Sequence, residues 1–498
     1  MPFKVAFIGA GSIGFTRKLL QDILSVPEFS GIEVAFTDIN QNNLDMVTQL
    51  CQADIDSNGL DIQIQSTLNR REAFRGAKYV INCCRVGLLE AFETDVNIPL
   101  KYGVDQCVGD TLCAGGIMYG QRGIAEYLAF CKDIREVAQP GCMMLNYSNP
   151  NAMVTWACNQ YGGVETIGLC HGVQGGARSI AEALGIPEQE LDYVCAGINH
   201  QTWYTSVKHK GKEMLPLLLD AFERHEKFSR TEKVRIDVMR HFGYFSTESN
   251  GHLSEYLPWY RKRTDEIERW INPELGGWVC GETAGYLRVC TEGRNWFEAD
   301  FANFHTWPRR KFAQEERSYE HGSYIIEGLE TGRVYRGHFN VVNNGAITNL
   351  PDDAIVEVPG YVDANGVNIP RVGDLPLGPA AICNASISVQ RLAVEAAVHG
   401  DVFLLKQAMM LDPLVGAVCT TAEAAQMTDE MLIAGEQWLP QYGEAIAAAK
   451  AYFASGKALP TKETQGAVRL HVKTVEEMAK DKEKARKLAE ASEKSGLG

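Results

Sequence analysis

A cysteine and a histidine that lie far apart in the sequence have the chemistry of metal ligands. Cys170 lies in "GLCHGVQGG", just after a predicted strand, and His200 lies in "CAGINHQTWY". A thiolate and an imidazole form a soft, borderline pair that suits a divalent transition ion. Two protein ligands leave positions open for substrate oxygens, which is typical of a catalytic site. The alternative is that Cys170 is a buried thiol and His200 a hydrogen-bonded core histidine.

A glycine motif near the N-terminus predicts a dinucleotide site. It has the pattern G-x-G-x-x-G and separates a predicted strand at 4–9 from a predicted helix at 15–25. Backbone can therefore approach a pyrophosphate, whose charge the helix N-terminus favours. Asp38 ends the next strand, where it can accept from a ribose 2′-hydroxyl, so NAD is preferred over NADP. The other predicted cofactor-binding residues are Gly9, Gly11, Ser12, Ile13 and Gly14. The alternative is a turn whose glycines serve packing only.

Strands and helices alternate along the first part of the chain and must position these residues. Apolar runs predict further strands, and amphipathic periodicity predicts helices. The predicted strands are 32–39, 61–66, 77–84 and 142–150, and the predicted helices are 40–56 and 116–138. This alternation predicts an α/β fold with a Rossmann-type, doubly wound parallel sheet.

The second part of the chain mixes long helical stretches with short strands. Residues 386–411 read as helical, and Asn-Gly turns within 345–370 predict hairpins. We expect an NAD-binding Rossmann domain at 1–200 and an α+β domain for substrate, metal and oligomerisation at 201–498, an architecture like that of lactate and malate dehydrogenases. The tail after Lys457 reads as a solvated helix or a frayed end.

Composition excludes several classes of partner. The 498 residues carry a formal net charge of −15, which would repel nucleic acid and anionic membranes. A small-molecule partner is favoured. The sequence lacks a recognisable secretion signal and any apolar run that approaches the length of a membrane span, which predicts a cytoplasmic protein. Fourteen cysteines are scattered through apolar stretches, where reduced thiols are expected.

Several motifs together resemble glycoside hydrolase family 4, the NAD- and manganese-dependent group that includes α-galactosidases, α-glucosidases, α-glucuronidases and 6-phospho-glycosidases. The motifs are "FIGAGSIGF", "DTLCAGGIMYGQR", "NYSNPNAM", "GLCHGVQG", "AGINHQTWY" and "VEVPGYVDANGV". The resemblance covers most of the chain, less so 262–310 and the tail after 450. It implies NAD and Mn²⁺ as cofactors and a homodimer or homotetramer.

The resemblance also implies an unusual route to hydrolysis. Hydride passes from sugar C3 to NAD, which makes the proton on C2 acidic, and a base removes that proton. The glycosidic oxygen then leaves by elimination, water adds, and the hydride returns. Matching motifs imply that Cys170 and His200 are the metal ligands and that Asn149 binds sugar hydroxyls.

The motifs do not single out one residue as the general acid or as the base at C2. His171 stands where some members carry an aspartate proposed as the acid, so it is the candidate to protonate the leaving oxygen. Tyr256 or His252, in "GHLSEYLPWY", is the candidate base at C2. Asp110, in "GDTLCAGG", is expected either to assist proton transfer, to position the nicotinamide, or only to stabilise its turn.

The substrate expected from these motifs is a non-phosphorylated α-glycoside. Among such substrates, an α-galactoside is favoured. Phe92 stands near the place where the phospho-specific branch carries a basic residue. If Arg263 or another basic side chain entered the pocket, an acidic sugar such as a uronic acid or sulfonated sugar would fit instead. Two other classes remain open, a 2-hydroxy acid dehydrogenase and a non-catalytic NAD-sensing protein.

Overall fold

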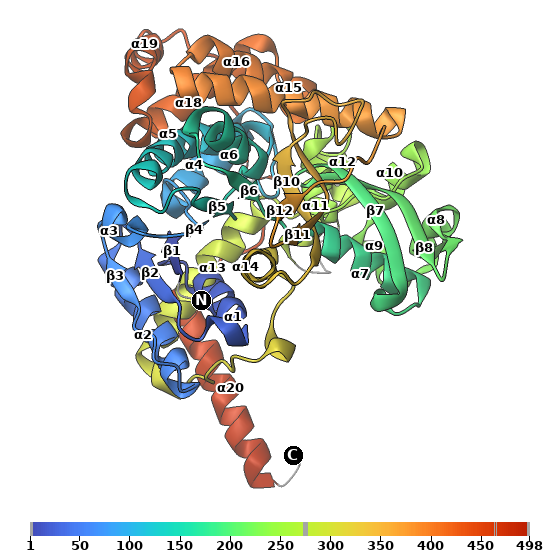
Figure 1. The fold of residues 1–498 in the computed structure, drawn as a ribbon. Helices are drawn as coiled ribbons and strands as arrows, with labels where there is room; N and C mark the ends of the chain where they lie inside the picture. Colours follow the sequence, from blue (N-terminus) through green and yellow to red (C-terminus); the bar gives the residue numbers. More distant parts are fainter. Residues whose placement is uncertain (1–2, 272–276, 463, 465, 496–498) are drawn as a thin grey trace.

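One mixed β-sheet runs through the described part of the molecule (Figure 1). The structure is a computed structural model that describes residues 3–271, 277–462, 464 and 466–495. The N-terminal strands are β1 (Lys4–Ile8), β2 (Glu33–Thr37), β3 (Gln65–Thr67), β4 (Tyr79–Asn82), β5 (Met143–Asn146) and β6 (Thr166–Gly168). They are parallel and lie in the order β3-β2-β1-β4-β5-β6. The doubly wound, Rossmann-type sheet predicted from the alternation is confirmed.

The remaining strands extend the same sheet with antiparallel pairs. They are β7 (Leu191–Ile198), β8 (Gln201–His209), β9 (Lys212–Glu213), β10 (Tyr335–Val342), β11 (Ile355–Asp363) and β12 (Gly366–Asn368). β10 joins the two parts, since Asn340 pairs with Gly168 of β6. The order continues β10-β11-β7-β8-β9, and β12 pairs with β11. The sheet is therefore continuous across residue 200, and the division at that residue stays a prediction.

Helices cover the N-terminal part of the sheet. They are α1 (Ile13–Leu24), α2 (Gln41–Ser57), α3 (Arg70–Phe74), α4 (Leu88–Lys101), α5 (Cys113–Val137), α6 (Asn151–Ala157) and α7 (Gly172–Leu184). α1 buries Leu19, Leu20, Ile23 and Leu24, the face that the periodicity predicts.

The later helices form separate groups in Figure 1. Around β7 and β8 lie α8 (Leu215–Arg224), α9 (Phe228–Thr231) and α10 (Lys233–Phe242). The middle of the chain adds α11 (Asn250–Tyr256), α12 (Thr264–Trp270), α13 (Gly285–Asp300) and α14 (His321–Thr331). The last helices are α15 (Leu377–His399), α16 (Val402–Leu411), α17 (Pro413–Val418), α18 (Thr421–Ala434), α19 (Gly443–Ala454) and α20 (Val475–Ser495). α20 is held to α13 by an ion pair of 2.7 Å between Lys482 and Asp300.

Local sequence signals explain where these elements end. The helical stretch at 386–411 is divided at Gly400, which has a φ of 65° and closes α15. The Asp401 side chain then caps α16 by accepting from the backbone N–H of Phe403 and Leu404. The predicted hairpin between β11 and β12 is present, with Asp363 paired to Gly366.

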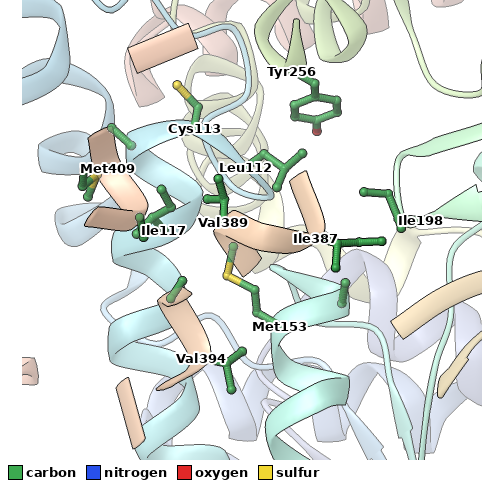
Figure 2. Packing of buried hydrophobic residues seen from close by; sticks show 14 of the residues in the cluster. Leu112, Cys113, Ile117, Met153, Ile198, Tyr256, Ile387, Val389, Val394 and Met409 are labelled. Carbon is green, nitrogen blue, oxygen red and sulfur yellow. The ribbon is translucent and has the colours of Figure 1, made fainter. Parts of the chain in front are cut away.

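The largest buried cluster packs α5 and α6 against α15 and α16, as Figure 2 shows. Ile117, Met153, Val389 and Met409 contribute to it and are at most 2% exposed. Burying each such side chain stabilises the fold by about 1.5–3 kcal/mol. The cluster thereby fixes α5, and the loop that leads into α5 enters the site described below. Among the described residues, no helix is both long and apolar enough to cross a membrane.

Candidate functional site

The candidate functional side chains gather at the carboxyl ends of β4, β5 and β6. Arg85 follows β4, Asn149 follows β5 and Cys170 follows β6. Parallel strands end at one edge of a sheet, and that edge is where ligands bind in such folds. A hydrogen bond of 2.9 Å from Asn82 Nδ2 to Asn146 Oδ1 ties two of these strand ends together.

Cys170 and His200 meet in space, together with Glu248. One ligand atom from each of the three lies within 4.8 Å of the others. Glu248 Oε1 is 3.7 Å from the Cys170 sulfur and 3.9 Å from His200 Nε2. Sulfur, nitrogen and carboxylate oxygen form a mixed donor set that fits a divalent transition ion. The geometry thus brings together the two predicted ligands and adds a third, which the sequence analysis did not identify.

The backbone around this cluster is shaped to bring the three donors together. His200 and Glu248 have φ values of 63° and 70°, a left-handed region that costs a non-glycine residue of order 1–3 kcal/mol. His200 occupies the tight turn between β7 and β8. A Cβ at Gly172 would lie 1.9 Å from Glu248 Oε1, so a larger residue there would displace the carboxylate from this position. Such strained positions cluster at functional sites.

A hydrogen-bond chain sets which nitrogen of His200 faces the cluster. The Thr111 hydroxyl donates to Asp110 Oδ1 at 2.9 Å, so its oxygen is left to accept from His200 Nδ1 at 3.0 Å. This arrangement places the ring proton on Nδ1 and leaves the lone pair of Nε2 facing Glu248. Metal-binding histidines are commonly oriented through their other nitrogen in this way.

Replacing Thr111 with valine is expected to weaken divalent-cation binding by about 10–100-fold, because the tautomer and orientation of His200 would no longer be fixed. Electron paramagnetic resonance of free Mn²⁺ measures this affinity directly. Thr111→Ser keeps the hydroxyl and should bind as the wild type does. Equal affinity in the valine variant would show that Thr111 does not orient His200.

Asp110 is engaged by three donors. Besides Thr111, Arg85 donates to its Oδ2 at 3.0 Å and Asn149 Nδ2 donates to the same oxygen at 3.1 Å. Asp110 is 1% exposed, and the Arg85 guanidinium lies over the ring of Phe92 at 4.3 Å. With both carboxylate oxygens occupied, Asp110 is placed to position Asn149 and Thr111.

His171 lies at the entrance to the site. Its Nδ1 is 3.3 Å from Glu320 Oε1, and half of its side chain is exposed. The hydrogen bond to Glu320 raises the pKa of His171. Although burial opposes ionisation of Glu320, the contacts with His171 and Lys18 lower the pKa of that carboxyl to about 2. The pair therefore favours a protonated imidazole, the form that a general acid requires.

Tyr256 and His252 both border the cluster, and their ring centroids lie 6.0 Å apart. The Tyr256 hydroxyl is 3.5 Å from His200 Nδ1, and the residue is 1% exposed. His252 Nδ1 is 3.7 Å from Glu248 Oε2 and 3.0 Å from the Ser249 hydroxyl. Burial lowers the pKa of His252 to about 4, so its imidazole is neutral near pH 7.

The glycine motif forms a cradle at the start of α1. The Gly11 N–H donates to Asp38 Oδ2 at 2.8 Å, and a Cβ at Gly9 would lie 2.8 Å from the backbone of Cys84. A Cβ at Gly14 would meet no heavy atom of the described chain within 4 Å, so this glycine leaves space at the helix N-terminus. Ser12 and Ile13 lie between these glycines, where α1 begins. The cradle fits a pyrophosphate.

Sequence patterns could not locate every residue of this site. Thr111, Glu248 and Glu320 were missed, although each contacts a predicted residue. Thr111 lies inside the quoted segment "GDTLCAGG", and Glu248 lies three residues before "GHLSEYLPWY". Glu320 had no signal of this kind, because only the packing of α14 brings it to His171.

Two family models together match most of the chain. The family 4 glycosyl hydrolase model matches residues 4–186, and the model of the C-terminal domain of these enzymes matches residues 195–415. The chain belongs to family 4 of the glycosyl hydrolases. The resemblance inferred from the motifs is therefore confirmed, and the protein is a glycosidase by family.

Individual family 4 proteins are similar over most of their length. An α-galactosidase of Rhizobium meliloti strain 1021 is 56% identical, over 97% of this chain and 98% of its own. An α-galactosidase of Bacillus subtilis strain 168 is 34% identical, over 88% and 99%. A crystal structure of a 6-phospho-α-glucosidase from gut microorganisms, in complex with NAD and Mn²⁺, superposes with a TM-score of 0.71 at 22% identity, covering 88% of this chain and 99% of that one.

Proposed function

We propose that the protein is an α-galactosidase that hydrolyses a non-phosphorylated α-galactoside by NAD-dependent oxidation at C3, proton removal at C2, elimination and addition of water. The convergence of Cys170, His200 and Glu248, with Asn149 connected to His200 through Asp110 and Thr111, carries the proposal. A dehydrogenase of 2-hydroxy acids has no use for a thiolate at its substrate. The α-galactosidase of Rhizobium meliloti, 56% identical, supports the choice of sugar.

The proposed cofactors are NAD and a divalent cation, Mn²⁺, as in the related 6-phospho-α-glucosidase. When bound, NAD supplies a reversible hydride acceptor for sugar C3, and the cation supplies a Lewis acid for the neighbouring sugar oxygens. The cradle from Gly9 to Gly14 would hold the pyrophosphate. Asp38 would accept from the adenosine ribose and repel a 2′-phosphate, so NAD is preferred over NADP. Cys170, His200 and Glu248 would hold the cation.

The chain's own side chains would move the protons. His171, protonated and held by Glu320, would donate to the glycosidic oxygen as the C1–O bond breaks. The base at C2 would be His252, whose neutral imidazole can take a proton, or the neighbouring Tyr256. Asn149 would bind sugar hydroxyls, oriented by its bond to Asp110.

Charges around the site favour a neutral sugar. Arg85 is paired with Asp110, and Lys18 is paired with Glu320. The Arg263 side chain is 59% exposed and pairs with Glu266, so it offers no fork for a carboxylate in the site. We therefore place a galactoside ahead of a uronide or a sulfonated sugar.

Replacing Glu320 with glutamine is expected to move the alkaline limb of the kcat/KM profile to lower pH. Glu320, with a pKa of about 2, is ionised at working pH and raises the pKa of His171. Without that charge His171 loses its proton at lower pH, and the acid form disappears earlier. The profile of kcat/KM against pH for an α-galactoside measures the shift. An unchanged alkaline limb would remove His171 as the acid.

The decisive test is hydrolysis of p-nitrophenyl α-galactoside in deuterated water, with and without NAD, Mn²⁺ and a thiol reductant. We expect activity to require NAD and the cation, and the released galactose to carry deuterium at C2. Direct displacement would leave C2 untouched, so hydrolysis without deuterium or without NAD would overturn the mechanism. Net accumulation of NADH with a 2-hydroxy acid would instead identify a dehydrogenase.

We place the protein in the cytoplasm, where NAD and a reduced metal-binding thiol are maintained. The fourteen cysteines of the sequence are all free thiols in the structure, as expected. A homodimer or homotetramer stays a prediction, which light scattering of the purified protein would test.

A further inference from the structure

A buried carboxylate that the proposed chemistry does not use binds the loop that leads into α5. Glu255 lies on α11 and is fully buried. Its Oε2 accepts from the backbone N–H of Cys107 at 2.7 Å and of Val108 at 3.0 Å, and its Oε1 accepts from that of Gly109 at 3.0 Å. Successive N–H groups that point at one anion form a nest. We call residues 107–111 the nest loop.

The nest loop ends in two residues of the candidate site. Gly109 has a φ of 63°, a left-handed conformation that suits glycine, and Asp110 and Thr111 follow it directly. Asp110 accepts from Asn149, and Thr111 hydrogen-bonds to His200. The buried carboxylate thus grips the backbone immediately before the pair that orients a sugar-binding amide and a proposed metal ligand.

Glu255 also joins the nest loop to the helix that carries both candidate bases. On α11, His252 lies three residues before Glu255, and Tyr256 is the next residue. Arg261, which follows this helix and is fully buried, donates through Nε to the Asp105 carbonyl oxygen at 2.6 Å. The chain just before the nest loop is therefore held as well, and the loop and α11 are connected at two places.

The contacts of Glu255 suit a carboxylate and no other side chain of its shape. Burial raises the pKa of Glu255 to about 7, whereas the backbone N–H groups and the Arg261 guanidinium oppose the rise. All three backbone groups are donors. A glutamine has one acceptor oxygen and a nitrogen that only donates. In a Glu255→Gln variant, at least one of the three N–H groups would therefore lose its acceptor.

We propose that Glu255 is a positioning residue, which fixes the nest loop so that Asp110 and Thr111 can orient the residues that bind sugar and metal. This inference rests on the proposed function. Glu255 is fully buried and backbone donors occupy both of its oxygens, so it acts through the loop and not on the sugar. Its loss should loosen the orientation of His200 and leave the glycine cradle for NAD intact.

Mn²⁺ binding to Glu255→Gln, followed by electron paramagnetic resonance of the free ion, tests the proposal. We expect affinity to fall about tenfold, equivalent to about 1.4 kcal/mol, with NAD binding unchanged in calorimetry. In the metal-free protein, hydrogen exchange measured by mass spectrometry should be faster in the nest loop, because its N–H groups lose their acceptor. Glu255→Asp keeps the charge on a shorter side chain and should show both effects more weakly. It carries the test if the glutamine variant does not fold.

A double-mutant cycle with Thr111→Val separates positioning from a general loss of stability. If Glu255 acts on the metal site through Thr111, adding Glu255→Gln to the valine variant should lower Mn²⁺ affinity further by less than about threefold. Fully additive losses would overturn the proposal, because they would show that the two residues act independently.

Asp412→Asn is the matched control. Asp412 is also a buried carboxylate, and it accepts from the backbone N–H of Cys113, Leu414 and Val415, which lie outside the nest loop. Its replacement should lower stability but leave Mn²⁺ affinity within about threefold of the wild type. If the control lost as much affinity as Glu255→Gln, any damage to this buried region would disturb the metal site, and the proposal would fall.

The outcomes separate the positioning role from the proposed function. Wild-type Mn²⁺ affinity in both Glu255 variants would overturn the positioning role alone, since the wild-type protein would still bind the cation. A wild-type protein that binds no Mn²⁺ would overturn the proposed function, and the role of Glu255 at a metal site with it. Reduced affinity together with faster exchange in the nest loop is the result that we expect.

Discussion

Replacement of Cys170 by alanine is expected to lower kcat/KM for an α-galactoside by about 10³-fold or more, since a metal ligand supports the charge that develops on the sugar oxygens. Steady-state kinetics measures the loss, and electron paramagnetic resonance measures the accompanying loss of Mn²⁺ affinity. NAD binding, followed by calorimetry, should persist, because the glycine cradle lies at the start of α1 and does not include Cys170.

The electrostatics of Cys170 explain the size of this effect. Burial raises the pKa of its thiol well above the ordinary value, and the nearby Glu248 charge adds to the shift. A thiol in such a place is protonated and inert unless a cation compensates, and a coordinated thiol loses its proton outright. Without a bound cation Cys170 would therefore have no chemical role in the site, which favours a role as a metal ligand.

Cys195→Ala is the matched control for the cysteine variant. Cys195 is also a buried thiol, on β7 of the same sheet, and burial raises its pKa as well. Its removal should cost only about 1 kcal/mol of folding free energy, near the value of a buried methylene, and leave turnover within about twofold. If Cys170→Ala behaved like this control, the metal site would have to lie elsewhere.

The sequence predicted the Rossmann half well because its signals are local. One short stretch holds the first two buried strands, the glycine turn and Asp38. The parallel direction of the strands follows from the alternation of strands and helices. Cys170 and His200 could also be paired in advance, but through the family motifs rather than through spacing. Nothing local marks that β10 and β11 lie between β6 and β7 in the sheet.

The contacts that the sequence could not predict are those between residues far apart in the chain. Glu320 reaches His171 only because α14 packs near the end of β6, and Thr111 contacts His200 although 89 residues separate them in the sequence. The base illustrates the same limit. The motif offered both His252 and Tyr256, and the structure places both next to the cluster, with their ring centroids 6.0 Å apart. Only the measured loss of C2 exchange in His252→Asn and in Tyr256→Phe separates them.

Glu248→Gln is expected to weaken Mn²⁺ binding and to lower kcat/KM by about 10²–10³-fold, although it changes the shape of the side chain very little. Burial opposes the charge of Glu248, but at the acid pH where the carboxyl titrates the positive charges of the protonated forms of His200, His252 and His171 outweigh it and lower the pKa of the carboxyl. Glu248 is therefore an anion at neutral pH, and as the proposed third ligand it would bring a full negative charge before any thiol ionises. The amide would keep an oxygen but lose that charge. Mn²⁺ titration at constant pH measures the change.

Glu357→Gln is the matched control, because it makes the same substitution at another buried glutamate close enough to be affected by the charge of Glu248. Burial, and then the charge of Glu248, raises the pKa of Glu357 to about 8, so this carboxyl is largely protonated at pH 7. Replacing a neutral carboxyl by a neutral amide removes no charge, so Mn²⁺ affinity should stay within about threefold of the wild type, less than 1 kcal/mol. If the two variants lost Mn²⁺ affinity equally, the negative charge of Glu248 would not be what the metal site requires. A loss confined to Glu248→Gln would make that residue the third protein ligand.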